Sequence, residues 1–250
     1  MDNGIWATWY DLPDEGRSDY LEWLHESELP SLLRRPGYAW AAHYAITSGG
    51  AKMDEIGSIL ARPDEPGLGT GTQFLILVGA PSPHVFLKPR MDTYDARPDA
   101  LSHEFRQFRQ GVRTCIFTTE ARVTGPDYGA KDAGGTPAPG IQMGSFRTKT
   151  LEDEIDIGAW YAQYRLPAMS RMPGCVETRK LVSVYGWAKH SILYEFTSLE
   201  SRHEHFQNHE SLALEDGEWT NRVINYTVHA PGSPSVGRRI WPAVATPQDS

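Results

Sequence analysis

The sequence predicts an α+β fold in which two tandem β-α-β-β-α-β units pack sheet to sheet as a barrel. The first observation is an internal repeat, because segments 20–37 and 157–174 share Trp, Leu-Pro and Pro-Gly landmarks. Each landmark recurs 137 positions later: 23 and 160, 30 and 167, 37 and 174. This period is far above the roughly 20 to 50 residues of solenoid repeats, so each copy is expected to be a compact unit.

The second observation is the order of predicted elements in the first unit. Residues 4–10 are apolar and rich in aromatic residues, which favours a buried strand. A helix is expected to begin with Ser18 as its N-cap and to end at Pro36-Gly37. Further strands are predicted at 38–46, 73–78 and 112–121, and a helix at 100–110. Residues 48–72 are rich in Gly, Pro and Asp and are expected to form a long loop.

The second unit repeats this order. Strands are predicted at 141–148, 176–185, 190–197 and 222–229, and helices at 153–172 and 199–209. The predicted domains are therefore a first repeat (1–122), a Gly- and Pro-rich linker (123–140), a second repeat (141–230) and an irregular C-terminal tail (231–250). The order is that of the ferredoxin-like split βαβ unit, a four-stranded antiparallel sheet with both helices on one face. The free face of each sheet is then covered most simply by the other sheet.

Composition indicates an ordinary globular protein. The chain has 250 residues, 40% of them hydrophobic, and a formal net charge of −8. Its acidic balance, with no Lys/Arg run longer than a pair, argues against nucleic acid as a partner. No apolar stretch approaches the roughly 20 residues of a membrane span, and no basic-then-apolar signal pattern is present, so we expect a cytoplasmic protein without a membrane partner. Cys115 and Cys175 lack CxxC spacing and are expected to be free thiols.

The repeated helix carries a family resemblance. Tyr20-x-x-Trp23, followed by Leu29-Pro30 and Pro36-Gly37 between two strands, resembles the dimeric α+β-barrel superfamily and most closely its EthD-like branch. EthD-like sequences commonly carry a His after this Trp, at the position that is Glu28 here and Arg165 in the second copy. The resemblance implies a fold shared by cofactor-free cyclases, isomerases and lyases, quinone-forming monooxygenases and haem-binding enzymes. It also makes a homodimer plausible, but the fold alone does not choose a reaction.

The two copies differ in their titratable residues, and the first copy is the preferred site. The groups peculiar to it are His25, Glu28 and His43, which correspond to Ala162, Arg165 and Lys180. Ala39, Ala41, His43 and Ala45 share one face of the second predicted strand, which leaves space beside the imidazole for a small molecule. A histidine there is suited to general base catalysis, although a core histidine bonded to a carbonyl is equally consistent with the pattern. His25 is the alternative candidate for the base. Glu28 and, at the end of the first strand, Tyr10 and Asp11 are the candidate proton partners.

Aromatic and cationic residues of the predicted strands are candidate substrate contacts. Trp6, Trp40 and Tyr44 would favour an aromatic substrate, although core packing is the more common role of such residues. Arg147 and Arg179 could anchor a substrate carboxylate through the guanidinium fork. A salt-bridged network between the halves is the alternative, because charges in strands are costly to bury unless they are paired.

No metal site is predicted. His203, His205 and His209 do not all lie on one helical face, and Phe206 stands where an HExxH motif requires Glu. No glycine-rich stretch has P-loop or dinucleotide-binding spacing, and no GxSxG motif occurs.

These observations predict a cofactor-independent lyase or isomerase. It would decarboxylate, dehydrate or cyclise a small aromatic or carboxylated molecule by proton transfer inside the barrel, with no bound cofactor. The alternatives are a haem-dependent or cofactor-free oxygenase on an aromatic substrate, and a non-catalytic ligand-binding barrel.

Overall fold

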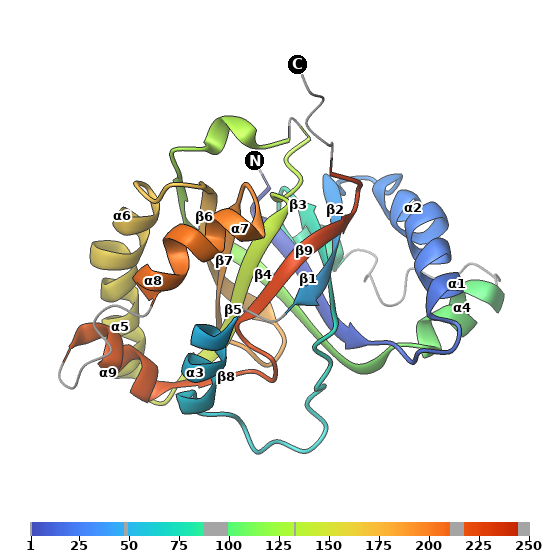
Figure 1. Ribbon diagram of the computed structural model, residues 1–250. Coiled ribbons are helices and arrows are strands. Elements are labelled where there is room, and N and C mark those ends of the chain that lie inside the picture. Colours follow the sequence, from blue (N-terminus) through green and yellow to red (C-terminus); the bar gives the residue numbers. More distant parts are fainter. Residues whose placement is uncertain (1, 48–49, 88–99, 133, 211–217, 245–250) are drawn as a thin grey trace.

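A computed structural model describes residues 2–47, 50–87, 100–132, 134–210 and 218–244. The strands stand at the centre of the molecule and helices lie on both outer sides (Figure 1). None of the described helices is both long enough and apolar enough to cross a lipid bilayer.

The first half is a four-stranded antiparallel sheet in the order β4-β1-β3-β2. Its strands are β1 (Gly4–Asp11), β2 (Trp40–Thr47), β3 (Phe74–Ala80) and β4 (Gln110–Thr124). The helices on its outer face are α1 (Arg17–Trp23), α2 (Leu29–Leu33) and α4 (Ala100–Gln107) (Figure 1). Two further helices, α3 (Ala51–Ile59) and the short 3₁₀ turn η2 (Pro83–Phe86), belong to the connections.

The second half has the same layout with a divided fourth strand. Its strands are β5 (Gly140–Thr148), β6 (Cys175–Tyr185), β7 (His190–Phe196), β8 (Thr227–His229) and β9 (Ser235–Trp241). The order is β6-β7-β5, and β8 and β9 pair with successive parts of the free edge of β5. Its outer helices are α5 (Leu151–Trp160), α6 (Leu166–Met169), α7 (Leu199–Ser201), α8 (Gln207–Glu210) and α9 (Trp219–Tyr226).

Two contacts between the halves close the strands into a barrel. At one contact β4 pairs with β6, and at the other β9 pairs with both β2 and β5. Every strand pairing is antiparallel, so eight strand positions form a closed antiparallel barrel with helices outside. This confirms the α+β barrel predicted from the sequence.

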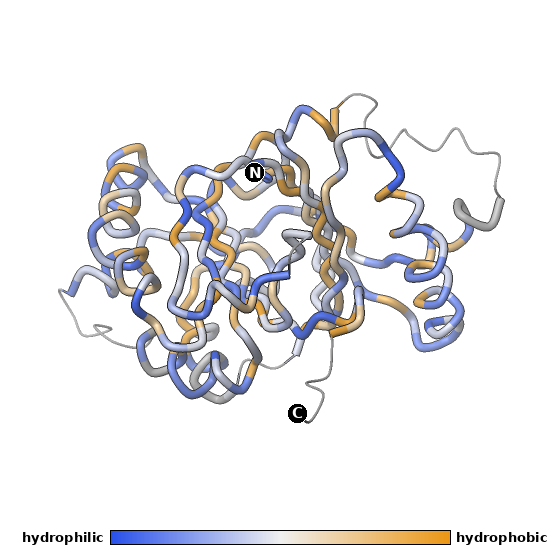
Figure 2. The backbone as a smooth tube through the Cα atoms, turned by 90° about the horizontal axis from the view of Figure 1, so that it is seen from above, coloured by the Kyte–Doolittle hydropathy of each residue, from blue (hydrophilic) through white to orange (hydrophobic). Residues whose placement is uncertain are grey.

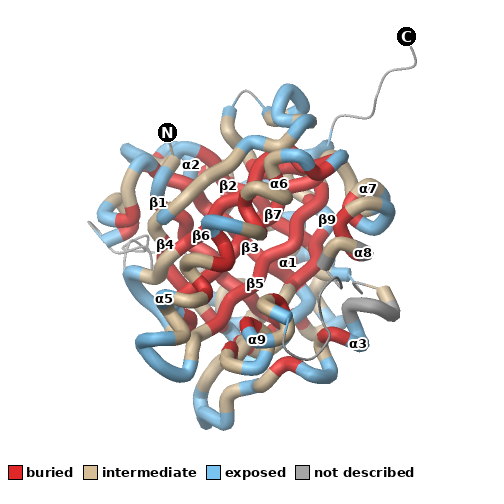
Figure 3. Tube along the Cα trace, turned by 90° about the vertical axis from the view of Figure 1, so that its left-hand side faces the viewer, coloured by how far each residue is buried: buried red, intermediate tan, exposed pale blue. Residues whose placement is uncertain are grey.

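The barrel interior is packed with side chains. Because side chains alternate along a strand, one face of each strand points inward and the other meets the helices. Trp9, Trp40 and Tyr44 lie in the inner cluster together with Leu77, Phe117 and Leu193. The strands form the buried centre of the molecule (Figure 3), and apolar residues gather along them in the view from above (Figure 2). Each half also has an apolar cluster between its strands and its own helices.

The repeated helix contains the same irregularity in both halves. A five-residue π-turn, η1 (Leu24–Glu28), joins α1 to α2, and η4 (Tyr161–Arg165) joins α5 to α6. The Leu29 N–H donates to the Leu24 carbonyl, and the Leu166 N–H to the Tyr161 carbonyl. Pro30 and Pro167 follow these Leu residues. Proline has no N–H, so regular helical hydrogen bonding is interrupted there, directly after each π-turn. The two π-turns begin 137 residues apart, at 24 and 161, which is the spacing of the sequence repeat.

The prediction of a strand at 222–229 is wrong. Helix α9 occupies Trp219–Tyr226, and only Thr227–His229 are extended. Thr220, Val223 and Thr227 are buried at helical spacing along this segment. That amphipathic pattern outweighs the strand preference of the local Val-Ile-Asn-Tyr sequence.

The predicted irregular tail instead contains β9, which supplies the missing strand. The strand is hard to predict from the sequence because it contains Arg238 and Arg239. Adjacent charges are unusual in a strand that pairs on both sides. Arg239 is buried and donates from Nη1 to Asp132 Oδ2 and to the Pro137 carbonyl, both at 2.7 Å. These bonds satisfy the charge within the structure.

Two smaller expectations are corrected. The segment 48–72 is not wholly a loop, because α3 forms at Ala51–Ile59 and buries Ile56. The first long helix begins at Arg17 with Gly16 as N-cap rather than with Ser18. Gly16 has a φ of 73°, a conformation that glycine adopts at little steric cost. The boundaries of the two units remain a prediction.

Candidate active site and ligand cavity

The structure brings three of the predicted residues into one hydrogen-bonded line, the Tyr10–His43–His25 chain. The Tyr10 hydroxyl lies 2.8 Å from His43 Nε2, and His43 Nδ1 lies 2.8 Å from His25 Nε2. Tyr10 comes from β1 and His43 from β2, and both point to the outer face of the sheet. His25 reaches them from the π-turn η1, in the helix layer above.

Burial decides the protonation of this chain. His43 and Tyr10 have no exposed surface, whereas His25 is half-buried. Burial, followed by His25 and Arg109, holds the pKa of His43 well below its usual value. Burial also lowers the pKa of His25, against an opposing effect of Glu26, and raises that of Tyr10 well above 10. All three groups are therefore neutral near pH 7.

Aromatic rings and one arginine enclose the chain. The Tyr10 and His43 rings are stacked 5.9 Å apart, and Phe74 lies within 5.6 Å of both. The Arg109 guanidinium lies 5.1 Å from the Tyr10 ring centre and donates through Nε to the Tyr20 hydroxyl at 2.6 Å. At the other end, the Trp241 ring of β9 stacks 6.4 Å from the His25 ring.

A cavity of about 220 Å³, the half-one cavity, lies in the same helix layer. Thr8, Thr114, Glu28, Arg106 and Arg109 form its polar wall. Its apolar wall consists of Trp6, Leu24, Leu29, Leu32, Ile76 and Val112. Glu28 accepts from Arg106 Nη2 at 2.7 Å, so this predicted site residue is paired with a cation. Arg109 borders both the cavity and the Tyr10–His43–His25 chain.

The predicted location inside the barrel is wrong for these residues. His43 and Tyr10 lie between the sheet and the helices, and the inward faces of the same strands carry Trp9, Trp40 and Tyr44. The alternating pattern defines two faces of a strand but not which one meets the other sheet. On β2 the face that carries Trp40 and Tyr44 is the one that fills the barrel.

Several predicted site residues have structural partners instead. Trp40 donates to Asp2 Oδ2 at 2.6 Å, and the Tyr44 hydroxyl donates to the Pro137 and Ala138 carbonyls at 3.1 and 3.0 Å. Asp11 accepts from the Thr72 and Gln73 N–H groups at 2.6 and 2.7 Å, which fixes the start of β3.

The two predicted arginine anchors behave differently from each other. Arg179 is fully buried and donates to Glu177, Glu195 and Asp2 within 3.0 Å. Lys131 and Arg122 complete this network, which joins the two halves as the salt-bridge alternative predicted. Arg147 is part-exposed, packs on the Trp187 ring at 4.5 Å and donates to the Trp187 carbonyl. Neither arginine lines the cavity of the first half.

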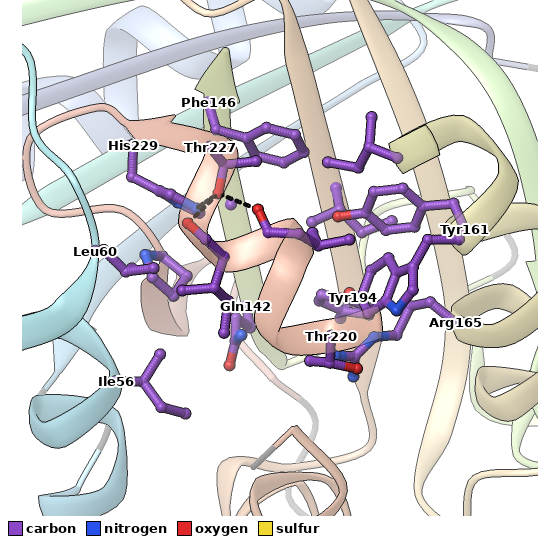
Figure 4. A pocket seen from close by; sticks show the side chains of 17 residues that line it. Ile56, Leu60, Gln142, Phe146, Tyr161, Arg165, Tyr194, Thr220, Thr227 and His229 are labelled. Atoms are coloured by element: carbon purple, nitrogen blue, oxygen red, sulfur yellow. Dashed lines mark hydrogen bonds between the residues drawn. The ribbon is translucent and has the colours of Figure 1, made fainter. Parts of the chain in front are cut away.

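A second cavity, which the sequence did not predict, lies in the helix layer of the second half (Figure 4). This half-two cavity measures about 80 Å³ and lies between β5, β7 and the helices α3, α5 and α9. Its aromatic lining comprises Phe146, Trp160, Tyr161 and Tyr194, and its polar residues include Gln142, Arg165, Thr220, Thr227 and His229. The sequence does not predict it because the lining segment 56–60 falls in a predicted loop and much of the lining segment 220–229 falls in the predicted strand 222–229. The one feature of the sequence that points to this cavity is that Arg165 stands where the first copy has Glu28.

Neither of these two cavities fits a haem. His43 has both ring nitrogens in hydrogen bonds, and His229 bonds Ser233 through Nδ1 and Thr227 through Nε2, at 3.3 and 3.2 Å. Both cavities are also smaller than the roughly 300 to 1,000 Å³ typical of sites for larger ligands. Among the described residues, no group of three or more His, Cys, Asp or Glu side chains is placed to hold a metal ion.

Solved structures share the fold of this chain. A candidate monooxygenase from Fusobacterium nucleatum superposes with a TM-score of 0.56 at 8% identity, over 96% of this chain and 93% of that one. A candidate chlorite dismutase gives 0.52 at 11%, over 96% of each chain, and an anthrone oxidase-like protein gives 0.51 at 10%, over 96% and 91%. No protein-family model and no curated protein matches the sequence. At these identities the likeness shows the fold alone, an α+β barrel.

Proposed function

We propose that the protein is a cofactor-independent enzyme that abstracts a proton from a small molecule, with His25 as the general base. The observation that carries this proposal is the unbroken Tyr10–His43–His25 chain, with both links at 2.8 Å. A base held by a second group, which is in turn held by a third, is the arrangement expected of a positioned catalytic residue.

One arrangement of protons makes His25 a base. If His25 donates from Nε2 to His43 Nδ1, its own Nδ1 keeps a lone pair for a substrate proton. His43 then donates from Nε2 to the Tyr10 hydroxyl. When Nδ1 of His25 takes a proton, the new positive charge strengthens its bond to the neutral His43. The lowered pKa of His25 keeps the base unprotonated at neutral pH, so it is ready to act.

The reaction class follows from what the proton abstraction initiates. Lyase or isomerase chemistry, such as decarboxylation, dehydration or cyclisation, requires only a positioned acid–base pair and a shielded site. The half-one cavity supports a substrate with both apolar and charged parts, because Glu28, Arg106 and Arg109 form one wall. Trp6 of the apolar wall is retained as a substrate contact.

A second candidate is a cofactor-free oxygenase, in which the deprotonated substrate itself reacts with oxygen. It is favoured by the descriptions of two fold neighbours as a candidate monooxygenase and as an anthrone oxidase-like protein. Oxygen consumption separates the two candidates. Turnover without oxygen supports the lyase or isomerase, whereas one oxygen consumed per product supports the oxygenase.

The test begins with a panel of aromatic carboxylic acids and phenols in heavy water, followed by proton NMR. Exchange of a substrate proton or formation of a product identifies a substrate. With that substrate, His25→Asn is expected to lower kcat by about 10² to 10⁴, the range of general base catalysis. The exposed His84→Asn is the matched control and should leave kcat unchanged. Undiminished turnover in both His25→Asn and His43→Leu would rule out the proposal.

Three finer assignments accompany this proposal. The matching π-turns at a spacing of 137 residues support an origin of the halves by tandem duplication. The Trp and Leu-Pro landmarks support a place in the EthD-like branch. A homodimer and a cytoplasmic location remain predictions.

A further inference from the structure

Hydrogen-bond donors without acceptors border the half-two cavity. Trp160 Nε1 and Arg165 Nε and Nη1 are all buried and have no hydrogen-bond partner among the described residues. Each of the two residues is only 4% exposed. A buried donor left unbonded is destabilising, more so when it carries a charge, and such groups are rare in folded proteins. The Arg165 side chain extends toward Thr220 at the edge of the cavity (Figure 4).

The Arg165 guanidinium has aromatic neighbours but no acid. Its Cζ lies 4.7 Å from the Trp160 ring centre and 5.5 Å from that of Phe206. Ring faces attract a cation but offer no lone pair to its N–H groups. Among the described residues no salt bridge joins Arg165 to a carboxylate. At the matching position of the first half, Glu28 is paired with Arg106, so the two copies differ at this position.

The remaining wall selects for a small ring. Phe146, Tyr161, Ile192 and Val223 line the cavity, whose volume is about 80 Å³. An engineered apolar cavity of roughly 150 Å³ in another protein binds benzene. The cavity here is smaller than that one, so a single ring is the largest hydrocarbon group it accepts, and its lining side chains must shift to admit the ring.

We propose that this cavity binds a single-ring aromatic carboxylate. The ring lies against Phe146 and Tyr161, and the carboxylate accepts hydrogen bonds from the Arg165 guanidinium and the Trp160 indole N–H. The planar fork of arginine matches the two oxygens of a carboxylate, and the indole adds a third donor. The site lies in the opposite half from the Tyr10–His43–His25 chain. Its occupancy therefore does not depend on catalysis there.

Isothermal titration calorimetry with benzoate as the probe, and benzamide as the uncharged analogue, tests this site. Benzoate is expected to bind the wild type at least about tenfold more tightly than benzamide, since hydrogen bonds to charged groups are the stronger ones. Arg165→Met fills a similar volume without charge and is expected to weaken benzoate binding about ten- to a hundredfold, with little effect on benzamide. Trp160→Phe removes one donor and should weaken benzoate binding by less.

Two controls keep the result interpretable. Arg171→Met removes an exposed arginine just beyond the same helix and should leave benzoate binding unchanged. Thermal unfolding of Arg165→Met should occur at or above the wild-type Tm, because an unpaired buried charge is lost. If that variant fails to fold, Arg165→Gln takes its place. Absence of benzoate binding at millimolar concentration, no preference over benzamide, or equal binding by the folded variant would each overturn the proposal.

Discussion

The helix layers of the two halves have the same backbone and opposite chemistry. In both, a π-turn followed by Leu-Pro sits over the outer face of a four-stranded sheet. In the first half that layer holds a neutral hydrogen-bonded chain, and its charged residue Glu28 is paired. In the second half Lys180 stands where His43 stands in the first, and Arg165 faces a cavity without an acid. A shared scaffold therefore does not imply a shared function.

The charges of the second half also differ in how they are satisfied. Lys180 is buried and bonds Glu120 at 2.9 Å and His190 Nδ1 at 3.1 Å. Burial, followed by the charge of Lys180, lowers the pKa of His190 to about 4. His190 therefore accepts from Lys180 as a neutral ring. The equivalent strand position in the first half needs no such counter-charge, because His43 is itself neutral.

The largest expected effect comes from breaking the network that both halves share. Arg179→Ala removes the central cation and leaves Glu177 and Glu195, both fully buried, with Lys131 as the remaining buried cation. We expect a loss of about 3 to 5 kcal/mol in the free energy of unfolding, measured with urea, because an uncompensated buried charge remains. Lys189→Ala removes an exposed partner of Glu154 and should cost about 1 kcal/mol or less. Similar losses in the two variants would mean that the network contributes little.

The next effect tests the first layer by itself. Tyr10→Phe deletes the hydroxyl that bonds His43 Nε2 and leaves that buried ring nitrogen without this partner. The free energy of unfolding should fall by about 1 to 3 kcal/mol, the usual cost of an unsatisfied buried group. The exposed Tyr185→Phe should change it by no more than about 0.5 kcal/mol. An unchanged urea midpoint in Tyr10→Phe would argue that water or another group replaces the hydroxyl.

A pH series sharpens the comparison in the second layer. Burial, followed by the charge of Arg62, lowers the pKa of His229 to about 3, whereas an unfolded His titrates near 6.5. Between these values the unfolded state holds one more proton, so this group's contribution to stability is full above about pH 6.5 and is lost as the pH falls toward 3. His229→Gln should therefore flatten the decline in unfolding free energy by up to about 1.4 kcal/mol per pH unit. The exposed His84→Gln is the control, and parallel curves for His229→Gln and wild type would contradict the assignment.

The smallest effect concerns the outer surfaces. Leu151 and Ile155 of α5 are 73% and 76% exposed, whereas the residues 137 positions earlier are the polar Asp14 and Ser18. Ile155→Lys should change the free energy of unfolding by no more than about 0.5 kcal/mol, since the side chain is in solvent. Light scattering after size exclusion then decides whether α5 mediates the predicted homodimer. A dimeric wild type and a monomeric variant would place the contact there, and equal masses would remove α5 from consideration.

Much of the fold could be predicted from local signals in the sequence. The strands of the first half and the first three strands of the second are largely apolar runs, several of which end near Gly or Pro, and each lies within a few residues of its predicted place. The segments assigned wrongly depend on distant contacts. Helix α9 is defined by the face it turns to the half-two cavity, and β9 by pairing with β2 and β5, which are far from it in sequence.

The candidate sites divide in the same way. His25, His43 and Tyr10 could be chosen one by one, because a strand pattern and a difference between the copies single them out. The sequence does not predict that these three residues form one chain outside the barrel. Their location depends on which faces of β1 and β2 point into the barrel. The half-two cavity is assembled from segments as far apart as Ile56 and Pro234, and no local pattern records that proximity.

The position of β9 has a consequence for how the protein is made. This strand follows every other described strand along the chain, yet it lies between β2 and β5 and joins the two halves. Synthesis at about 5 to 20 residues per second leaves roughly 5 to 20 seconds between the completion of β5 and that of β9. During that interval β2 and part of β5 present open backbone edges, which readily pair with other chains. The growing chain therefore depends on shielding, by chaperones or by its own helices, until residues 235–241 arrive and close the barrel.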